Sequence, residues 1–124
     1  MDQNLGKVTI APNVLVTIVQ KTSLAEPGVA QLCENVPGVK RLLGIHTASQ
    51  GVAVSVADNQ VTVNVHLVAR RGVDLLGMGR NLQNEITRAM QDIVGMKVCE
   101  VNIHIDDIAT ELAADADSEK AKRK

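Results

Sequence analysis

A run of alternating apolar and polar residues between Gly51 and Arg71, GVAVSVADNQVTVNVHLVARR, leaves this chain few ways to fold. Valines at every second position before and after the central Asp-Asn pair are typical of two strands that each bury one face. Asn tolerates the positive φ that a two-residue type I′ turn requires, so Asp58 and Asn59 are expected to join the strands. The stretch therefore predicts a β-hairpin with three facing valine pairs, namely Val56 with Val61, Val54 with Val63, and Val52 with Val65.

Two other segments have the spacing of amphipathic helices. The first is expected to begin at Pro12, because proline is favoured at the first helical position, and to end before Pro27 and Gly28. Its predicted apolar face consists of Val14, Leu15, Ile18, Val19, Thr22 and Ala25. The second is expected to run from an N-cap at Asp74 to about Val94, with Gly95 in the left-handed position that follows a helix. Its predicted apolar face consists of Leu75, Met78, Leu82, Ile86, Ala89, Met90 and Ile93.

Two glycines in the first turn of the second helix, Gly77 and Gly79, need a reason, because each costs up to about 1 kcal/mol relative to alanine. A GxG sequence after a strand and at a helix start suggests a phosphate-binding loop. The third glycine and the following Lys-Ser or Lys-Thr of such loops are missing, however. Close packing of the helix on the sheet is the favoured interpretation.

A last strand is predicted from Met96 to Ile105, with Cys99, Val101, Ile103 and Ile105 pointing inward. The segments VNVHL at 63–67 and VNIHI at 101–105 share one pattern, so the strand, helix and strand from 61 to 105 predict a parallel β-α-β unit. Five polar residues would then share the outer face of the sheet, and we expect this face to be a contact surface: Thr62, Asn64, His66, Asn102 and His104. A metal site formed by the two histidines with Glu100 or Asp106 is the alternative, since histidine is a common metal ligand.

The remaining segments are less regular. Lys7 to Ile10 alternates like a short strand and stops at Ala11 and Pro12. EPGV at 26–29 and VPGV at 36–39 predict turns, VAQLCENV is ambiguous, and VKRLLG is compatible with one helical turn before Gly44. Lys40 and Arg41 are interpreted as a solvated surface pair. Residues 109–124 are charged with few large apolar groups, so a disordered tail is predicted there, with a frayed helix near Thr110 to Ala114 as the alternative.

Composition excludes several classes of protein. The 124 residues suffice for one domain, with a net charge of −1 and no Phe, Tyr or Trp. Base or sugar stacking on aromatic rings is therefore excluded, and the charge gives no general reason to bind nucleic acid. Cys33 and Cys99 are too few and too far apart for a disulfide framework or a zinc site of four cysteines. No secretory signal or membrane-spanning run is present in the sequence, which favours a cytosolic protein without direct membrane insertion.

These patterns together predict a single α+β domain in residues 1–108 followed by the tail. Two helices pack on one face of a mixed sheet of about four strands, in the order β-α-β-β-α-β. We find no Ser/His/Asp constellation, paired carboxylates or phosphate loop, and so expect no catalytic residue, cofactor, resident metal or small-molecule substrate.

The sequence also resembles a known family. GKVTIAPNVL, then EPGVA, then GVAVSVADNQVTVNVHLV, and finally the block from Gly72 through VGMKVCEVNIHI resemble the alkaline shock protein family of bacterial envelope stress proteins over residues 6–108. The chain is unlike the usual family pattern in Gly77 and Gly79, where larger helix formers are common, and in His66 and His104, at positions that are often aromatic.

The resemblance implies an intracellular protein without known catalytic residues that functions in envelope homeostasis. It also implies self-assembly and a membrane-anchored partner that holds the protein at the inner face of the membrane. The leading hypothesis is thus an interaction or scaffolding protein. Two alternatives remain open, a metal- or ligand-binding protein that uses His66 and His104, and a nucleic-acid-associated regulator that uses Arg70, Arg71 and the basic tail.

Overall fold

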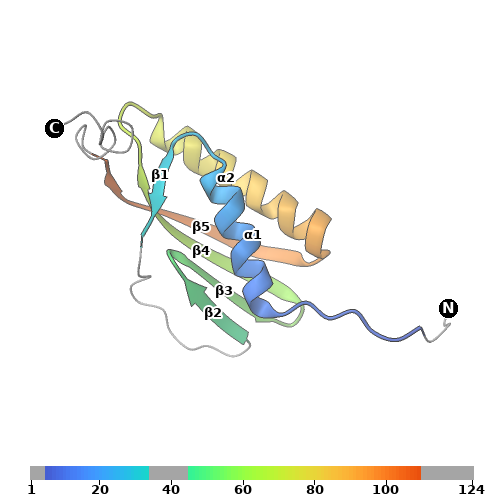
Figure 1. Cartoon of the computed structure of the whole chain (residues 1–124). Helices are drawn as coiled ribbons and strands as arrows, with labels where there is room; N and C mark the ends of the chain where they lie inside the picture. The colour runs from blue at the N-terminus through green and yellow to red at the C-terminus, as the bar shows by residue number, and fades with distance from the viewer. Residues whose placement is uncertain (1–4, 34–44, 110–124) are drawn as a thin grey trace.

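The protein is a layer of two helices on one face of a five-stranded mixed sheet (Figure 1). The computed structural model describes residues 5–33 and 45–109. The elements in chain order are α1 (Pro12–Leu24), β1 (Val29–Leu32), β2 (Ile45–Ser49), β3 (Val52–Ala57), β4 (Gln60–Ala69), α2 (Leu75–Ala89), the π-helical turn η1 (Met90–Val94) and β5 (Lys97–Ile108). The predicted α+β class and the packing of both helices on one face are confirmed.

The central hairpin has the predicted register. Val52 pairs with Val65, Val54 with Val63 and Val56 with Val61, and β3 and β4 run antiparallel. Asp58 and Asn59 have φ values of 51° and 65°, as a type I′ turn requires. The valines at 52, 54, 61, 63 and 65 are at most 2% exposed, so the period-2 pattern directs one face of the hairpin into the core.

Strand β4 is the centre of the sheet. On one edge it pairs with β5 in parallel along its whole length, which confirms the predicted β-α-β unit. Its other edge is shared, because β3 pairs with positions 60–65 and β1 pairs antiparallel with positions 67–69. Strand β2 extends the sheet beyond β3.

The helices bury aliphatic faces against the hairpin. On α1 the buried residues are Leu15, Val16, Val19 and Ser23, so the predicted face is partly wrong, with Val14 42% exposed. On α2 and η1 the buried residues are Met78, Leu82, Ile86 and Met90, as predicted. Ile93 is 67% exposed, contrary to expectation, because the wider π-helical turn changes the phase of the helix before it ends at Gly95, whose φ is +76°.

Three predictions about the strands are corrected. Residues 7–10 form no strand, and β1 and β2 were not predicted, so the observed order is α-β-β-β-β-α-β. Cys99 is exposed, because a register shift places it as an extra residue between the pairs Val61–Val98 and Thr62–Glu100. The VPGV and VKRLLG segments, Lys40 and Arg41, and the predicted tail from residue 110 lie outside the described residues.

Candidate functional site

The sheet face opposite the helices brings the predicted polar residues together. In the parallel register of β4 and β5, Asn64 pairs with Asn102 and His66 with His104, while Thr62 pairs with Glu100. The accessibility of these residues is uneven. His104 is exposed, Thr62, Asn64 and Asn102 are half-buried, and His66 is only 9% exposed.

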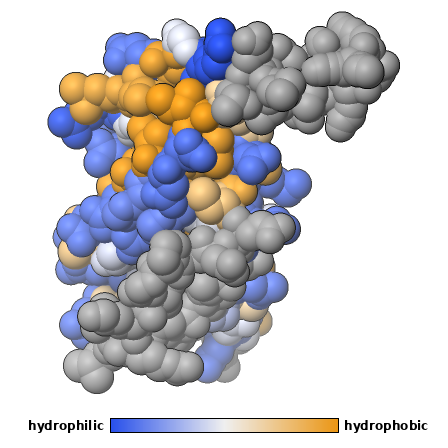
Figure 2. Space-filling model, turned by 90° about the vertical axis from the view of Figure 1, so that its left-hand side faces the viewer, coloured by the Kyte–Doolittle hydropathy of each residue, from blue (hydrophilic) through white to orange (hydrophobic). Residues whose placement is uncertain are grey.

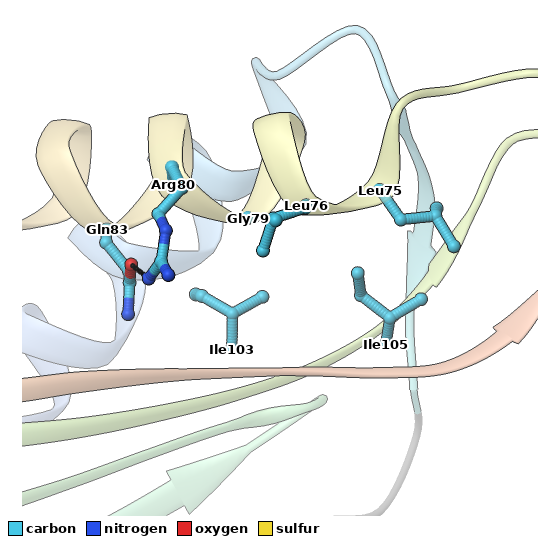
Figure 3. A pocket seen from close by; sticks show the side chains of 7 residues that line it. All are labelled: Leu75, Leu76, Gly79, Arg80, Gln83, Ile103 and Ile105. Carbon is cyan, nitrogen blue, oxygen red and sulfur yellow. Dashed lines mark hydrogen bonds between the residues drawn. The ribbon is translucent and has the colours of Figure 1, made fainter.

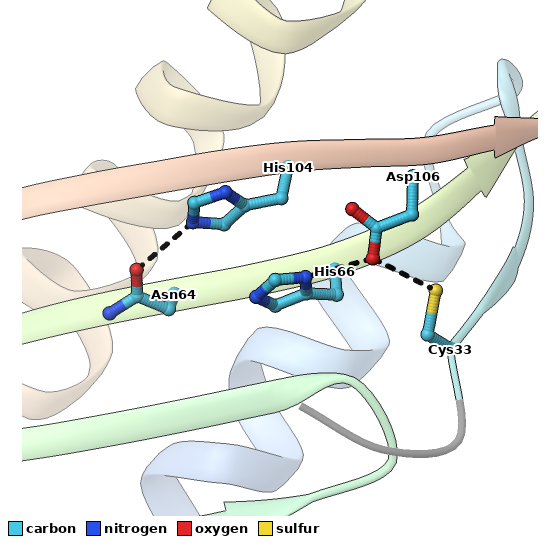
Figure 4. A network of polar contacts seen from close by, with 5 residues as sticks. All are labelled: Cys33, Asn64, His66, His104 and Asp106. Carbon is cyan, nitrogen blue, oxygen red and sulfur yellow. Dashed lines mark hydrogen bonds and ion pairs between the residues drawn. The ribbon is translucent and has the colours of Figure 1, made fainter. Parts of the chain in front are cut away.

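The two histidines form a stacked pair (Figure 4). Their ring centroids lie 4.2 Å apart and the ring planes differ by 8°. The Nε2 atom of His104 lies 3.2 Å from Oδ1 of Asn64, which requires the proton on that nitrogen because an amide oxygen only accepts. The repeated VNVH and VNIH patterns thus place like residues side by side across the parallel ladder.

A carboxylate fixes the buried histidine. Oδ2 of Asp106 lies 2.9 Å from Nδ1 of His66, and the Sγ atom of Cys33 donates to the same oxygen at 3.6 Å. A second register shift in β5 follows Ile105, so that the next pair in the ladder joins Val68 to Asp107. β-bulges reorient side chains in this way, and here the bulge accompanies the turn of the Asp106 carboxylate toward His66 and β1.

The backbone of His66 lies where two strands meet end to end. Its N–H donates to the carbonyl of Gly51 at 2.7 Å, and its carbonyl accepts from the N–H of Cys33 at 3.0 Å. A Cβ at Gly51 would lie 2.7 Å from the oxygen of His66 and 2.8 Å from that of Cys33, and its φ of +81° is itself a glycine conformation. Glycine at position 51 is therefore needed for β3 and β1 to share one edge of β4.

Burial and neighbouring charge change the acid-base behaviour of this network. Burial lowers the pKa of His104, and the adjacent His66 lowers it further, while Asp106 acts in the opposite direction. Burial raises the pKa of Cys33, as do its hydrogen bond to Asp106 and the negative charges of Asp106 and Asp107. The lowered pKa of His104 favours its neutral imidazole, and the raised pKa of Cys33 favours its neutral thiol.

This chemistry does not resemble that of a nucleophilic or metal site. Thiolate is the reactive form of cysteine, and the raised pKa keeps Cys33 protonated. The Asp106 carboxylate binds both the thiol and the imidazole, so His66 is not placed to take the thiol proton. The stacked rings of His66 and His104 are nearly parallel, and in-plane nitrogen lone pairs of such rings do not converge on one ion. Within residues 5–33 and 45–109, no three His, Cys, Asp or Glu side chains are grouped so that they could hold a metal.

The two unexplained glycines have different surroundings from those predicted. The N–H of Gly77 donates to the N-cap carboxylate of Asp74 at 3.1 Å, and a Cβ at position 77 would lie 2.5 Å from that carboxylate. Gly77 thus fits the cap rather than the sheet. A Cβ at Gly79 would meet nothing within 4 Å, so the prediction of close packing is wrong there.

Two residues of the network were missed or only partly identified from sequence. Cys33 lies in a segment without clear periodicity, so the sequence excludes it from a disulfide framework and a zinc site but predicts no contact for it. Asp106 is predicted only as a ligand in the alternative metal site. Of the basic residues in the nucleic-acid hypothesis, Arg70 uses its Nε to bind the carbonyl of Pro27 at 3.0 Å. That contact closes the loop before β1 against the end of β4.

Taken together, the fold and the outer face define a small α+β protein with an accessible polar sheet surface. Comparison with known proteins identifies its family: residues 1–110 match the model of the alkaline shock protein 23 family, described as having a cell envelope-related function, and the chain belongs to this family. The resemblance seen in the sequence is thereby confirmed.

Two curated relatives are themselves described as uncharacterized. The chain is 32% identical over 105 residues to the protein YqhY of Bacillus subtilis, covering 84% of this chain and 78% of that protein. It is 26% identical over 110 residues to the protein Spy1535 of Streptococcus pyogenes serotype M6, covering 86% and 82%. No solved structure matches significantly. Neither helix in the described part of the chain has the length and apolar character needed to span a membrane.

Proposed function

We propose that this protein is a non-enzymatic interaction and scaffolding protein of the bacterial envelope stress response, which acts from the cytoplasm through protein contacts and self-association. Its membership in a family with a cell envelope-related function supports an envelope-associated role. A membrane-anchored partner that captures the protein would connect it to the membrane.

The observation that carries the proposal is the polar face of the sheet, which no helix of the described part of the chain covers. Both helices pack on the opposite face, and the accessible side chains at Thr62, Asn64 and Asn102 are small, uncharged and half-buried. Such groups cost less to bury in an interface than charged ones, and charged residues are depleted in interface centres. His104 adds an exposed ring to this surface.

The network beneath this surface favours recognition over chemistry. His66 is held by a 2.9 Å contact to Asp106 and by the parallel ring of His104, so the surface is fixed before a partner arrives. A surface that is already ordered loses less conformational entropy on binding. We therefore assign Thr62, Asn64, Asn102 and His104 to the contact surface and His66 to its support.

The proposal is tested by recovering tagged full-length protein from native cells, with the membrane and soluble fractions analysed separately. A Thr62→Arg, Asn102→Arg double variant introduces two long charged side chains on the polar face. It should lose the partner that co-purifies with the wild type and move from the membrane fraction to the soluble fraction.

The matched control is an Asn84→Arg, Gln91→Arg double variant, which makes the same charge change on exposed positions of the helical layer. This control should behave as the wild type does. If the polar-face variant keeps its partner and its fraction, the outer face is not the contact surface and the proposal fails.

A further inference from the structure

An apolar groove lies between the first turns of α2 and the outer edge of β5 (Figure 3). It has a volume of about 360 Å³ and is lined by Leu75, Leu76, Gly79, Arg80, Gln83, Ile103 and Ile105. Leu76 is 68% exposed, and the open space at Gly79 widens the groove. Apolar side chains are gathered on one area of the end of the molecule shown in Figure 2. Contiguous exposed apolar surface of this kind often marks a site of interaction.

The strand beside this groove has an open edge. The carbonyl of Val101 accepts from Nε2 of Gln83 at 3.0 Å, so it points away from β4. Because backbone groups in a parallel strand alternate between its two neighbours, Ile103 and Ile105 direct their N–H and C=O groups toward the same open side. Within the described residues β5 pairs only with β4, so this edge can accept another strand.

The segment before α1 has the alternating pattern of a β-strand but lies outside the sheet. Lys7 to Ile10 alternates like a strand, yet it forms none, and it leaves large apolar side chains in solvent. Leu5 is 93% exposed, Val8 94% and Ile10 44%. We call residues 5–10 the arm.

We propose that the arm of a second copy of this chain adds to the free edge of β5 as an antiparallel strand and fills the apolar groove. With Ile10 opposite Ile103, Val8 lies opposite Ile105, and both apolar arm residues face α2, since directly opposite residues share a face.

Charge complementarity supports this occupant and this direction. In the register given above, Lys7 lies opposite Asp106 and next to Asp107, at the acidic end of β5. A parallel arrangement would move the lysine away from both carboxylates. The main-chain hydrogen bonds of the added strand would provide affinity, and the alternating side chains would provide specificity.

The arm cannot reach the groove of its own chain. Gly28, just after α1, packs against Met78 in the first turns of α2, so the start of α1 lies a helix length of roughly 20 Å away from the groove. Ile10 lies two residues before Pro12, a distance that the extended chain spans in at most about 7 Å, and Figure 1 shows the arm leaving the body at the end opposite the start of α2. The contact is therefore between copies. Since arm and groove are different surfaces, it generates an open chain of copies unless the rotation closes a ring.

Sedimentation velocity on the full chain tests this proposal, which rests on the self-association in the proposed function. The wild type should form species larger than a monomer as concentration rises. Val8→Glu places a carboxylate in the groove from the arm, and Gly79→Glu places one there from α2. Each variant alone should associate about tenfold or more weakly, since an unpaired carboxylate is costly in an apolar site.

An equal mixture of the two variants provides the decisive result. Val8→Glu retains an intact groove and Gly79→Glu retains an intact arm, so together they should form a one-to-one complex and nothing larger. Thr9→Glu makes the same charge change on the other side of the arm, and Gly79→Ala adds only a methyl group. Both controls should assemble as the wild type does, and Gly79→Glu should melt no lower than the wild type, because glutamate is the better helix former.

A wild type that stays monomeric at its highest attainable concentration would overturn the proposal, and so would a Val8→Glu variant that assembles normally or a mixture that forms no complex. Recovery of the cellular partner tests the proposed function separately from the arm contact. If Val8→Glu loses assembly but keeps the partner, while the Thr62→Arg, Asn102→Arg variant loses the partner, both the arm contact and the polar-face contact are supported. If the mixture forms no complex while the polar-face variant still loses the partner, only the arm contact is overturned.

Discussion

Asp106 Oδ2 lies 2.9 Å from Nδ1 of His66, although 40 residues separate the two in sequence. The contact joins the bulged end of β5 to the point on β4 where β3 and β1 meet. It also brings a carboxylate within reach of the thiol of Cys33, the residue that follows β1. The Asp106 side chain thus connects β5 to β4 and to the end of β1.

The Cys33 thiol reports on this contact. Asp106→Asn removes the negative charge that, together with burial, raises the pKa of Cys33, so the pKa should fall and the thiolate fraction at a given pH should rise. Alkylation of Cys33 should therefore be faster in this variant. The measurement is the pH dependence of alkylation by mass spectrometry in a Cys99→Ser background. An unchanged profile would show that the carboxylate does not act on the thiol.

Stability should depend on the protonation of His104. Its pKa is lowered in the folded state by burial and by His66, so the unfolded chain binds the proton more readily. Stability should thus be full above the unfolded value of about 6.5 and should decrease as the pH falls through it. Denaturant titrations at a series of pH values should show a shallower acid-side decrease for His104→Gln than for the wild type. Equal slopes would contradict this assignment.

The hairpin core should not tolerate charge at its centre. Val63 is fully buried, so Val63→Asp leaves a carboxylate without a partner and should cost more than about 4 kcal/mol of unfolding free energy. Asn64→Asp, one position along and half-buried on the outer face, should change it by less than about 1 kcal/mol. Circular dichroism during thermal and denaturant unfolding measures both. A cooperative transition near the wild-type midpoint for Val63→Asp would contradict the register.

Two glycines with similar backbone angles should lose different amounts of unfolding free energy when each is replaced by alanine. Gly51 has φ of +81° and Gly72 of +79°, but only at Gly51 would a Cβ meet backbone atoms, at 2.7 and 2.8 Å. Gly72→Ala should therefore cost only the left-handed backbone penalty of about 1 to 2 kcal/mol. Gly51→Ala should cost clearly more, because β3 and β1 must move apart. Equal costs in denaturant unfolding would show that close approach is not the reason for glycine at position 51.

The sequence predicted those parts of the fold in which the hydrophobic pattern of a segment and the strand that pairs with it specify the same structure. Alternation from Val52 to Leu67 and an Asp-Asn turn specify one pairing, so the hairpin register could be predicted. The arm alternates equally well but pairs with no strand among the described residues of its own chain, and alternation alone does not reveal that. On α1, adjacent apolar residues at positions 14, 15 and 16 leave no single periodic face, so the predicted face was partly wrong.

The candidate site was predictable only in part for a related reason. The repeated Val-Asn-X-His pattern places His66 beside His104 once the strands are parallel, and that pair could be inferred. The contact of His66 with Asp106 and Cys33 depends on a bulge in β5 and on where β1 joins the sheet. Neither feature leaves a periodic signal in the sequence, and the bulge at Cys99 was missed for the same reason.

Site-specific photo-crosslinking in native cells tests the contact surface most directly. A photoreactive residue at Thr62 samples the polar face, and one at Asn84 samples the exposed side of α2. If the outer face of the sheet receives the partner, irradiation should give a discrete protein adduct from position 62 and none from position 84. Adducts from position 84 alone, or from neither position while the partner still co-purifies, would contradict this account.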